Sequence, residues 1–528
     1  MGGVIAAGSQ MTAEAGAAML RQGGNAVDAA VAAAFASFIA EMGVVHWGGS
    51  GLAQIYDPAQ GHSVVYDFFS NMPGLGRERP EKLDFERVTI DFGSAKQSFY
   101  LGRGSVAAPG NLFGLCRMAA DYGSLPLPTL LEPALKLARQ GFTISPFQAE
   151  TSQLLAPLYT HTAGMRAIYQ RQGRLVQAGD SVFVPDLYAT LQQLAEEGEA
   201  FLRHGALGRA LVADQAAHGG LITAADLAQY TVARAAPIRV PYRQFEILLP
   251  PPCSSGGVLL AFAFHVLAAF EVDKLGVGSA DYLQLLTEVM AAATRARAAW
   301  EQALAAGEAA AAVDAFLHPD AIAPYIDEVR TALRRGAPSP IGPEPKAPEH
   351  TSHLSVIDSR GMAVSLTTTA GESAGYVVPG TGFIPNNMLG EEDLNPHGWH
   401  QWQPGRRIPT MMAPTIVLLD GRIRLVTGSG GSARIRSAIL QTISHLLDQR
   451  LRLDEAVNRP RVHLDNDGVL QCEGGYDAAA AATLAERGYA VNRWPRQGIY
   501  FGGAHSVSRT PEGRLVGAGD RRREGATA

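Results

Sequence analysis

The segment from Gly336 to His350 constrains this chain most, because it reads GAPSPIGPEPKAPEH and holds five prolines. Proline lacks a backbone N–H and fixes φ, so such a run cannot continue a helix or an interior strand and favours an extended, exposed tether. Directly after it the pattern turns to β, and 353–369 alternates around a short turn as a hairpin does. The tether therefore divides the chain into 1–350 and 351–528.

The composition describes a large protein with a substantial core. At 528 residues and 47% hydrophobic, the chain can bury one large core or several small ones, and its length alone suggests about three or four domains. Charged residues make up 18%, below the roughly 25% usual for soluble domains, and Ala and Gly take their place rather than low-complexity polar sequence. This composition excludes the disordered and fibrous classes. The net charge of −6 gives no basic field for a polyanion, so we expect no nucleic-acid partner.

The sequence gives no membrane, export or disulfide signal. The longest uncharged stretch, 247–270, is interrupted by three prolines and a glycine pair, so it predicts a core segment rather than a membrane span. The first residues have neither a basic n-region nor a long apolar h-region, and we expect a cytoplasmic protein. The three cysteines are widely spaced without a CxxC pair, which favours small core residues over a disulfide framework or a zinc site: Cys116, Cys253 and Cys472.

Apolar periodicity predicts helices and strands on both sides of the tether. The spacing over 12–22 is helical, and Asn25 can cap a second helix that runs to about Glu41. Asp420-Gly421 is a strong two-residue turn signal inside 414–427, which predicts a second hairpin. The remaining predicted elements are strands near 52–57, 63–68, 245–249, 489–492, 506–509 and 515–518 and helices near 130–139, 185–197, 224–230, 279–316, 434–448 and 478–487. This is a mixed α/β (α+β) pattern without internal repeats.

Several common catalytic motifs are absent. Ser50 and Ser432 each lack the second flanking glycine of a nucleophile elbow, and there is no GxGxxG segment or Walker lysine loop. Two histidine pairs, 350/353 and 397/400, have HxxH spacing but no accompanying helical glutamate. We therefore interpret them as loop or hydrogen-bonding histidines and predict no metal site.

Thr351 is the residue with the clearest possible chemistry. A threonine at the start of a strand is ordinarily a residue with good strand propensity. If the backbone were cut before Thr351, however, the new α-amine would have a pKa of about 7.7 to 8.0, far below that of a lysine. Such an amine can act as the base for its own hydroxyl, and the exposed tether would let the two ends separate.

Seven segments carry a resemblance to a known family, and they occur in the family's order: QGGNAVDAAVAAAF (22–35), PGNLFGL (109–115), PALKLARQGF (133–142), PPPCSSGG (250–257), TSHLSVIDSRGMAVSLTTT (351–369), APTIVLL (413–419) and VTGSGGSARI (426–435). In them the chain resembles the γ-glutamyltransferase family of N-terminal nucleophile hydrolases over nearly its whole length. The resemblance implies a four-layer αββα sandwich, self-cleavage between His350 and Thr351, and a heterodimer of 1–350 and 351–528. It also implies that the Thr351 hydroxyl carries an acyl group from an amide donor to water or an amine.

The resemblance also implies roles for residues around the nucleophile. Thr369 matches the family's second threonine, which hydrogen-bonds the nucleophile. Gly431 and Ser432 match the paired glycines whose N–H groups form the oxyanion hole, and a serine is tolerable there because main-chain donors perform that role. No cofactor is implied, because the chain supplies nucleophile, base and oxyanion donors.

The departures from the family lie where its members hold the glutamyl group. Phe69 replaces the arginine that clamps the α-carboxylate with a bidentate contact. Gly371 stands at the position of a glutamyl-binding asparagine. The remaining substrate-binding positions are Asn387, Met388 in place of a polar residue, Glu391 in place of the acid that receives the α-amine, and Thr410 and Met411 in place of a serine pair. The predicted pocket is therefore more apolar and has lost its carboxylate partner.

The leading hypothesis is a self-processing amidohydrolase or acyltransferase, with a small-molecule γ-glutamyl or more apolar acyl amide as donor. Glutathione should bind about two orders of magnitude more weakly than in the family unless Arg77, Arg79 or Arg103 reaches the pocket. The alternatives are an unprocessed, inactive paralogue that acts as a binding or scaffold protein, an acylase for a non-glutamyl amide, and a conventional hydrolase with an unrelated nucleophile.

Overall fold

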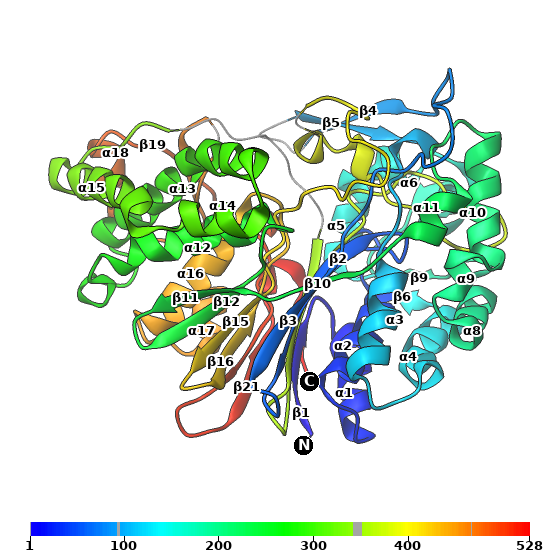
Figure 1. The fold of residues 1–528 in the computed structure, drawn as a ribbon, viewed down its shortest axis with the longest axis horizontal. Coiled ribbons are helices and arrows are strands. Elements are labelled where there is room, and N and C mark those ends of the chain that lie inside the picture. The colour runs from blue at the N-terminus through cyan, green and yellow to red at the C-terminus, as the bar shows by residue number, and fades with distance from the viewer. Residues whose placement is uncertain (1, 92–95, 342–350, 396, 466) are drawn as a thin grey trace.

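Two β-sheets face each other at the centre of the molecule, and helices cover the outer face of each (Figure 1). The computed structural model describes residues 2–91, 96–341, 351–395, 397–465 and 467–528. The predicted four-layer αββα arrangement is confirmed. His350, the residue on the other side of the predicted cleavage site, lies outside the described residues.

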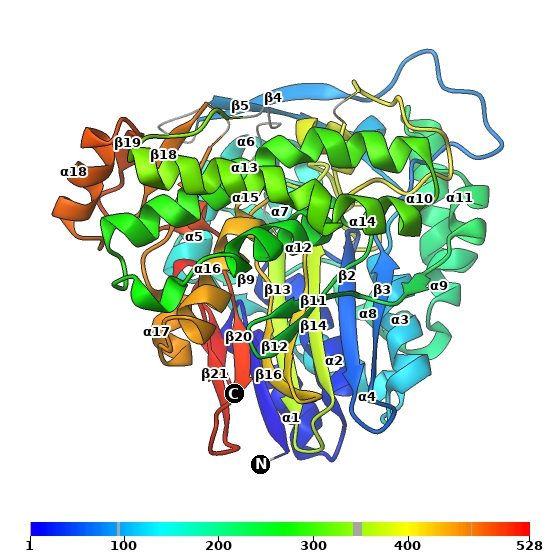
Figure 2. The same cartoon turned by 60° about the vertical axis from the view of Figure 1, so that its left-hand side comes forward.

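The first sheet has seven strands, and the two strands that follow the tether lie at its centre. Its order is β10 (Ala233–Ala235), β3 (His62–Phe68), β2 (Ser50–Asp57), β14 (Ala363–Thr369), β13 (Thr351–Asp358), β1 (Gly3–Ala7) and β22 (Ala526–Thr527). Strands β13 and β14 form the predicted hairpin, and every residue of both is buried. Figure 2 shows β13 and β14 alongside β2, which comes from the other side of the tether.

The second sheet also combines strands from both sides of the tether. Its order is β11 (Ile238–Tyr242), β12 (Phe245–Leu249), β15 (Thr415–Leu419), β16 (Arg422–Thr427), β20 (Ser506–Arg509) and β21 (Leu515–Ala518). Strands β15 and β16 form the second predicted hairpin, and its turn residues Asp420 and Gly421 both have positive φ, as a two-residue hairpin turn requires. Because both sheets mix strands from before and after residue 351, the tether does not separate two independent domains.

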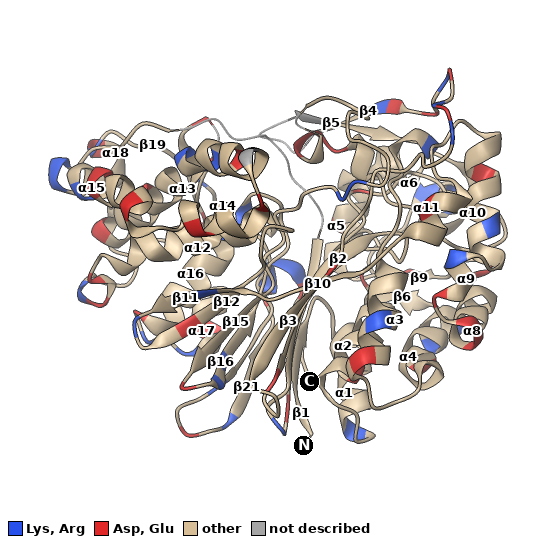
Figure 3. Cartoon of the chain, viewed as in Figure 1, with Lys and Arg blue, Asp and Glu red and all other residues tan. Residues whose placement is uncertain are grey.

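Different helices cover the two sheets (Figures 1 and 2). The first sheet packs against α1 (Gln10–Arg21), α2 (Ala26–Ala40) and α3 (Asn111–Tyr122). Helix α4 (Leu127–Gln140) packs on α2, and α5 (Pro146–Leu154), α8 (Leu187–Glu197), α10 (Ala206–Ala217) and α11 (Ala224–Gln229) lie farther out. The second packs against α12 (Ser255–Ala268) and α17 (Leu453–Asn458), with α16 (Arg434–Leu447) between these two helices. Helix α13 (Ala280–Ala306) packs on α12, and α14 (Ala309–Phe316), α15 (Pro319–Arg335) and α18 (Ala478–Glu486) pack on α13. Charged residues occur mainly on the helices and loops outside the two sheets (Figure 3).

Helix α2 is the central helix of the first layer, and its sequence explains its place. All fifteen of its residues are buried, and most are alanine, so it can lie close to the sheet on one side and to other helices on the other. Asn25 caps its start, as predicted, and the Asp28 side chain accepts a hydrogen bond from the Asn25 N–H, which completes a capping box. The helix ends at Ala40, and its C-cap residue Glu41 lies beside the first residues of β13.

The space between the sheets is filled by small apolar residues. Ala6, Ile357, Ile416, Val426 and Val507 are all fully buried there. The segment 247–270, interpreted as a core segment, forms the end of β12 and the buried helix α12. Over the described residues, no helix combines the length and apolar character that a bilayer crossing needs.

Candidate active site

Thr351 is the first residue of β13, and it lies directly opposite Thr369 of β14. Its side chain is completely buried, and Oγ1 has no hydrogen-bond partner among the described residues. Thr369 Oγ1 accepts a bond of 3.0 Å from the backbone N–H of Gly371. A buried hydroxyl without a partner is costly, so this arrangement is suited to a hydroxyl that meets its partner during a reaction.

A glycine-rich turn between β16 and α16 packs against the main chain of Thr351. A Cβ atom at Gly430 would lie 2.0 Å from the Thr351 carbonyl oxygen, so only glycine fits this contact. Gly431 has φ of 115° and Ser432 has φ of 50°, which explains why glycine suits both positions. Ser432 Oγ donates to Asp393 Oδ2 at 2.9 Å. The structure thus brings the predicted oxyanion segment to the predicted nucleophile.

Arg523 approaches Thr351 from the C-terminal segment, and it is not among the site residues predicted from the sequence. Its Nη1 donates to the Thr351 carbonyl oxygen at 2.9 Å, and its Nε has no partner among the described residues. The side chain is only 5% exposed and crosses Gly503, where a Cβ atom would lie 2.2 Å from Arg523 Cδ. Burial lowers the pKa of Arg523 to about 10. The guanidinium group is therefore still charged at neutral pH.

A buried ionic network holds this C-terminal segment in place. Arg461 and Arg522 both pair with Asp520, at 2.7 and 3.1 Å, and Arg522 also contacts Glu473. Burial opposes ionisation of Asp520, but the two guanidinium groups outweigh it and lower the pKa of this carboxyl. One feature of the sequence could have pointed to this segment: three consecutive arginines follow Asp520. Such a run is unusual in a chain with few charged residues, and this segment has no helical spacing.

Glu41 is a second buried group that the sequence analysis missed as a site residue. It accepts hydrogen bonds from Thr12 Oγ1, at 2.6 Å, and from Ser352 Oγ. Burial raises the pKa of Glu41 although these hydroxyl groups and the nearby Arg523 lower it. Thr351 thus begins a strand whose second residue is fixed to the end of α2.

A cavity of about 220 Å³ opens beside these residues, and we call it the β1-side cavity. It is lined by Gly8, Ser9, Gln10, Met11, Ala40, Glu41, Val44, Ser145, Phe147, Gln148, Thr351, Ser352, His505, Arg523 and Glu524. Gln10 and Glu524 are exposed and lie at its mouth, whereas Thr351, Glu41 and Arg523 are buried at its inner end. The predicted nucleophile therefore forms part of the wall of a cavity that reaches the surface.

The residues predicted to bind the acyl donor lie on the opposite side of β13, beyond β14. Gly371 has φ of 62°, and a Cβ atom there would lie 2.2 Å from Asn387 Oδ1 and 2.9 Å from Glu391 Oε1. Asn387 Oδ1 accepts from the Glu372 N–H at 2.7 Å, and its Nδ2 has no partner among the described residues. Asn387 and Glu391 therefore occupy the space that an asparagine side chain at 371 would need.

Phe69 and Met388 come together, as their apolar character predicts. Both are almost completely buried in a small cluster that also includes Leu52, Ile408 and Met412. Met411 does not join this cluster: its backbone, like that of Thr410, lies against the start of α12. Part of the predicted substrate pocket is therefore a packed apolar core.

An arginine does lie near Phe69, but its bonds are to the protein. Arg407 donates from Nη1 to the Phe69 carbonyl oxygen and to the Tyr230 hydroxyl, and it pairs with Asp67 at 3.3 Å. The three arginines considered from the sequence bind elsewhere: Arg77 to the Gly220 carbonyl, Arg79 to His400, and Arg103 to Asp84 and Asp214. None of these bonds reaches Thr351.

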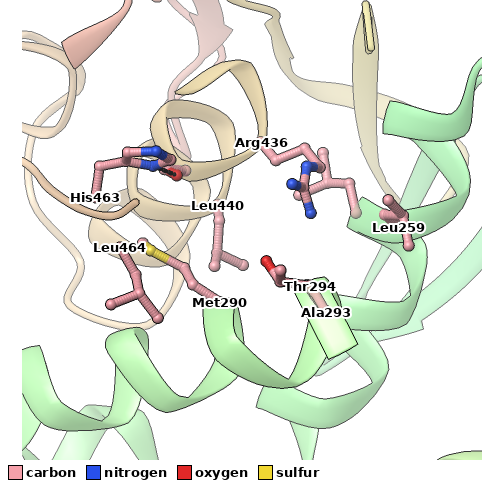
Figure 4. A pocket seen from close by; sticks show the side chains of 11 residues that line it. Leu259, Met290, Ala293, Thr294, Arg436, Leu440, His463 and Leu464 are labelled. Carbon is pink, nitrogen blue, oxygen red and sulfur yellow. Dashed lines mark hydrogen bonds between the residues drawn. The ribbon is translucent and has the colours of Figure 1, made fainter. Parts of the chain in front are cut away.

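A second, smaller cavity lies between α12, α13 and α16 and is not part of this site. Figure 4 shows Arg436, Thr294 and Met290 around it, and its volume is about 20 Å³, close to the space that one water needs. His463 there shares a hydrogen bond of 2.7 Å with Ser437 Oγ. Within the described part of the chain, no group of three or more His, Cys, Asp or Glu side chains could hold a metal ion.

Sequence comparisons connect the whole chain with known proteins. The family described as Gamma-glutamyltranspeptidase matches residues 12–528. The "Acylase ACY 1 proenzyme" of Pseudomonas sp. (strain SE83) is 36% identical over 529 residues, which cover 99% of this chain and 92% of the acylase. The "Glutathione hydrolase proenzyme" of Escherichia coli (strain K12) is 29% identical over 556 residues, which cover 98% of this chain and 90% of the hydrolase.

Solved structures agree with these relationships. The cephalosporin acylase from Bacillus halodurans has a TM-score of 0.83 at 25% identity, with 100% of this chain and 95% of that chain covered. The gamma-glutamyltranspeptidase of Helicobacter pylori has a TM-score of 0.54 at 29% identity, with 63% of this chain and 91% of that chain covered. Proteins with acylase names and proteins with transpeptidase names therefore share this fold.

Proposed function

Since the chain belongs to the gamma-glutamyltranspeptidase family, whose members cleave acyl amides, we propose that it is a self-processing threonine amidohydrolase and acyltransferase. The observation that carries this proposal is Thr351, whose buried hydroxyl has no hydrogen-bond partner among the residues that the structure describes, at the start of a strand, opposite Thr369 and against the turn at 430–432. A nucleophile needs a base, and the α-amine released by cleavage at 350/351 has a suitable pKa of about 7.7 to 8.0.

The proposed reaction has two acyl-transfer stages. In processing, Thr351 Oγ attacks the carbonyl carbon of residue 350, the C–N bond breaks, and water hydrolyses the resulting ester. In turnover, the same oxygen attacks the donor amide, the amine leaves with a proton, and water or an amine then takes the acyl group. The main-chain N–H groups at Gly431 and Ser432 would stabilise the oxyanion in both stages.

We further propose that the acyl donor lacks the α-carboxylate of a γ-glutamyl group. Phe69 cannot pair with a carboxylate, and Arg407 is already bound to Asp67 and Tyr230. The Glu391 carboxyl group and Asn387 Oδ1 lie beside Gly371, where they can accept hydrogen bonds from an amine on the acyl chain. The acylase name of a 36% identical relative is consistent with a donor other than glutathione.

Processing is tested by mass. Purified wild-type protein should give two fragments of about 37 and 19 kDa, apportioned by length from the 55.9 kDa chain, and mass spectrometry should read Thr351 at the start of the smaller one. Thr351→Ala should remain one band without activity, and Thr351→Ser should still be processed, more slowly. One intact wild-type band would instead support the inactive scaffold alternative.

Donor choice is tested with three matched anilides. The γ-glutamyl anilide carries both a carboxylate and an amine, the glutaryl anilide only the carboxylate, and the 4-aminobutanoyl anilide only the amine. We expect the 4-aminobutanoyl compound to have the highest kcat/KM, and the γ-glutamyl compound to react about 100-fold more slowly than in a glutathione hydrolase. Rapid γ-glutamyl turnover would contradict this proposal and show that another cation holds the carboxylate.

A further inference from the structure

The segment that follows α15 is held against the second helical layer before the chain reaches the predicted cleavage site. Gly336, with φ of 58°, is the C-cap of α15, and the structure describes the chain from there to Ile341. We call residues 336–341 the tether anchor. Residues 342–350 connect the tether anchor to Thr351 and lie outside the described residues.

Glu288, on α13, fixes the middle of the tether anchor. Its side chain is 1% exposed, and it accepts hydrogen bonds from the Ser339 hydroxyl and, at 3.3 Å, from the Ser339 N–H. The Tyr489 hydroxyl donates to the same carboxyl group at 2.6 Å. A buried carboxyl group is costly unless it is hydrogen-bonded, so these three bonds favour keeping Ser339 in its place.

Arg295 holds the next residue of the tether anchor. It lies seven residues after Glu288 and therefore on the same face of α13. Its Nη1 donates to the Pro340 carbonyl oxygen and, at 3.0 Å, to Ser339 Oγ. Its Nη2 pairs with Glu328 of α15 at 2.8 Å. One guanidinium group thus connects the tether anchor with both α13 and α15.

The tether anchor also touches residues from the other side of the cleavage site. A Cβ atom at Gly468 would lie 2.6 Å from Ile341 Cδ1, and one at Gly488 would lie 3.6 Å from Pro338 Cδ. Both glycines come after residue 351, and Gly488 follows α18, which packs on α13 (Figure 2). The tether anchor is therefore fixed on a surface to which both parts of the chain contribute.

We propose that the tether anchor positions the cleavage site, and that Glu288 and Arg295 are positioning residues for processing between residues 350 and 351. This inference rests on the proposed function, because it concerns the self-processing of the same chain. The two residues act through the connecting chain and not by contact with the reacting atoms.

The orientation of residue 350 decides whether processing can begin. The Thr351 nitrogen is already bonded to the carbonyl carbon of residue 350, so this peptide group must turn until Thr351 Oγ can reach that carbon. Oγ then bonds to the carbon, the C–N bond breaks, the hydroxyl proton ends on the released amine, and water hydrolyses the ester.

Fixing the start of the connection favours the productive orientation. The connection has nine residues, 342–350. A chain of this length that is fixed at both ends leaves its last residue fewer orientations than a chain fixed at one end. The freedom of a single backbone residue corresponds to a factor of about five to thirty in an equilibrium. Loss of the tether anchor should therefore slow processing measurably without touching Thr351.

The first test follows processing from the moment of synthesis. Cell-free translation of the full chain is stopped, and denaturing gels then give the rate at which the intact band becomes two fragments. Ser339→Ala combined with Arg295→Met should slow this rate about fivefold or more. Ser339→Thr combined with Arg295→Lys keeps a hydroxyl and a charged donor, and should be processed faster than the first pair. Arg330→Met removes an exposed arginine of α15 that pairs with Asp327 at 3.1 Å, and this matched control should leave the rate unchanged.

The second test asks whether the fixed point lies at residues 338–341. Gly-Gly-Ser inserted after Ile341 adds up to about 10 Å to the connection and should slow processing. The same insertion after Gly336 precedes the anchored residues, which can keep their contacts, and should leave the rate nearly unchanged. In the Ser339→Ala/Arg295→Met background the two insertions should have equal effects. Equal effects in the otherwise wild-type chain would contradict a fixed point here.

Activity after cleavage separates positioning from a general fault of the fold. Processed protein from each variant should have the wild-type kcat/KM for the best anilide, because the tether anchor acts before cleavage. Anchor variants that lose this activity along with their processing rate would overturn the assignment. Anchor variants that are processed at the wild-type rate would also overturn it and leave the proposed function standing, whereas a wild-type chain that stays intact overturns both.

Discussion

The surroundings of Thr351 and the cluster around Phe69 are both buried, but they are buried in different ways. Around Thr351, polar atoms such as its own Oγ1 and Arg523 Nε lack partners within the described residues. Around Phe69, apolar side chains fill the space, and Arg407 is fully engaged. The first region keeps unsatisfied groups available for a reaction, whereas the second is ordinary core. Changes in the first should therefore alter chemistry, and changes in the second should alter stability and donor choice.

The largest effect should come from Gly430→Ala, in the first region. The added Cβ atom would lie 2.0 Å from the Thr351 carbonyl oxygen, so the turn or the nucleophile must move. A shift of about 1 Å in a catalytic group costs about 100-fold in rate, and we expect losses of this size or more in processing and turnover. The rates of fragment formation and anilide hydrolysis measure this. Gly307→Ala, where a Cβ atom meets nothing within 4 Å, is the control.

An effect on stability rather than on rate should follow from Phe69→Ala in the second region. Phe69 is only 1% exposed, and removing a buried phenylalanine costs about 3 to 5 kcal/mol of stability. Urea unfolding should show this loss, while processing at 350/351 continues. Phe183→Ala removes a side chain that is 47% exposed, and it should cost far less. If Phe69→Ala blocked processing in protein that is still folded, the two regions would not be separable.

The sequence predicts these two regions unequally, for physical reasons. The pairing of Thr351 with Thr369 could be predicted because strand alternation and a turn define a hairpin locally. The loss of a positive charge could be predicted because Phe69 stands where the family motif has arginine. Arg523 could not be found in this way, because it reaches Thr351 across 172 residues and its contacts depend on Gly503 having no side chain. Asn387 fills the space that a side chain at position 371 would occupy. This contact also depends on three-dimensional packing, which the spacing of residues in the sequence does not reveal.

His505, which lines the β1-side cavity, should contribute to the pH dependence of stability, together with other buried histidines whose pKa burial also lowers, such as His46 and His445. Burial lowers the pKa of His505 to about 4, and its Nδ1 accepts the Asp520 N–H. Because the unfolded chain binds this proton near pH 6.5, stability is complete above that pH and is lost as pH falls toward 4. Between pH 7 and pH 5 the part of this loss that comes from His505 is about 2 kcal/mol, from linkage.

The His505→Asn substitution should remove the contribution of His505 to the loss of stability between pH 7 and pH 5, and urea unfolding at the two pH values measures it. Asn keeps an acceptor for the Asp520 N–H and does not titrate. His318→Asn, at an exposed helix cap, should leave the slope as in the wild type. An unchanged slope in His505→Asn would mean that this histidine is not held neutral in the folded protein, and that the acid sensitivity arises elsewhere.

The smallest effect should come from Ser432→Gly, which tests whether a polar group of the first region acts through its side chain or its backbone. Glycine removes the cost of φ at 50°, about 1 kcal/mol, but it also removes the bond to Asp393, worth about 1.5 to 3 kcal/mol. We expect a net loss near 1 kcal/mol in the wild type and a gain of about 1 kcal/mol in the Asp393→Ala background, where the bond is already gone. Turnover should stay within about twofold throughout, because the N–H group of residue 432 remains. A tenfold loss of turnover in folded Ser432→Gly would instead give the hydroxyl itself a part in the chemistry.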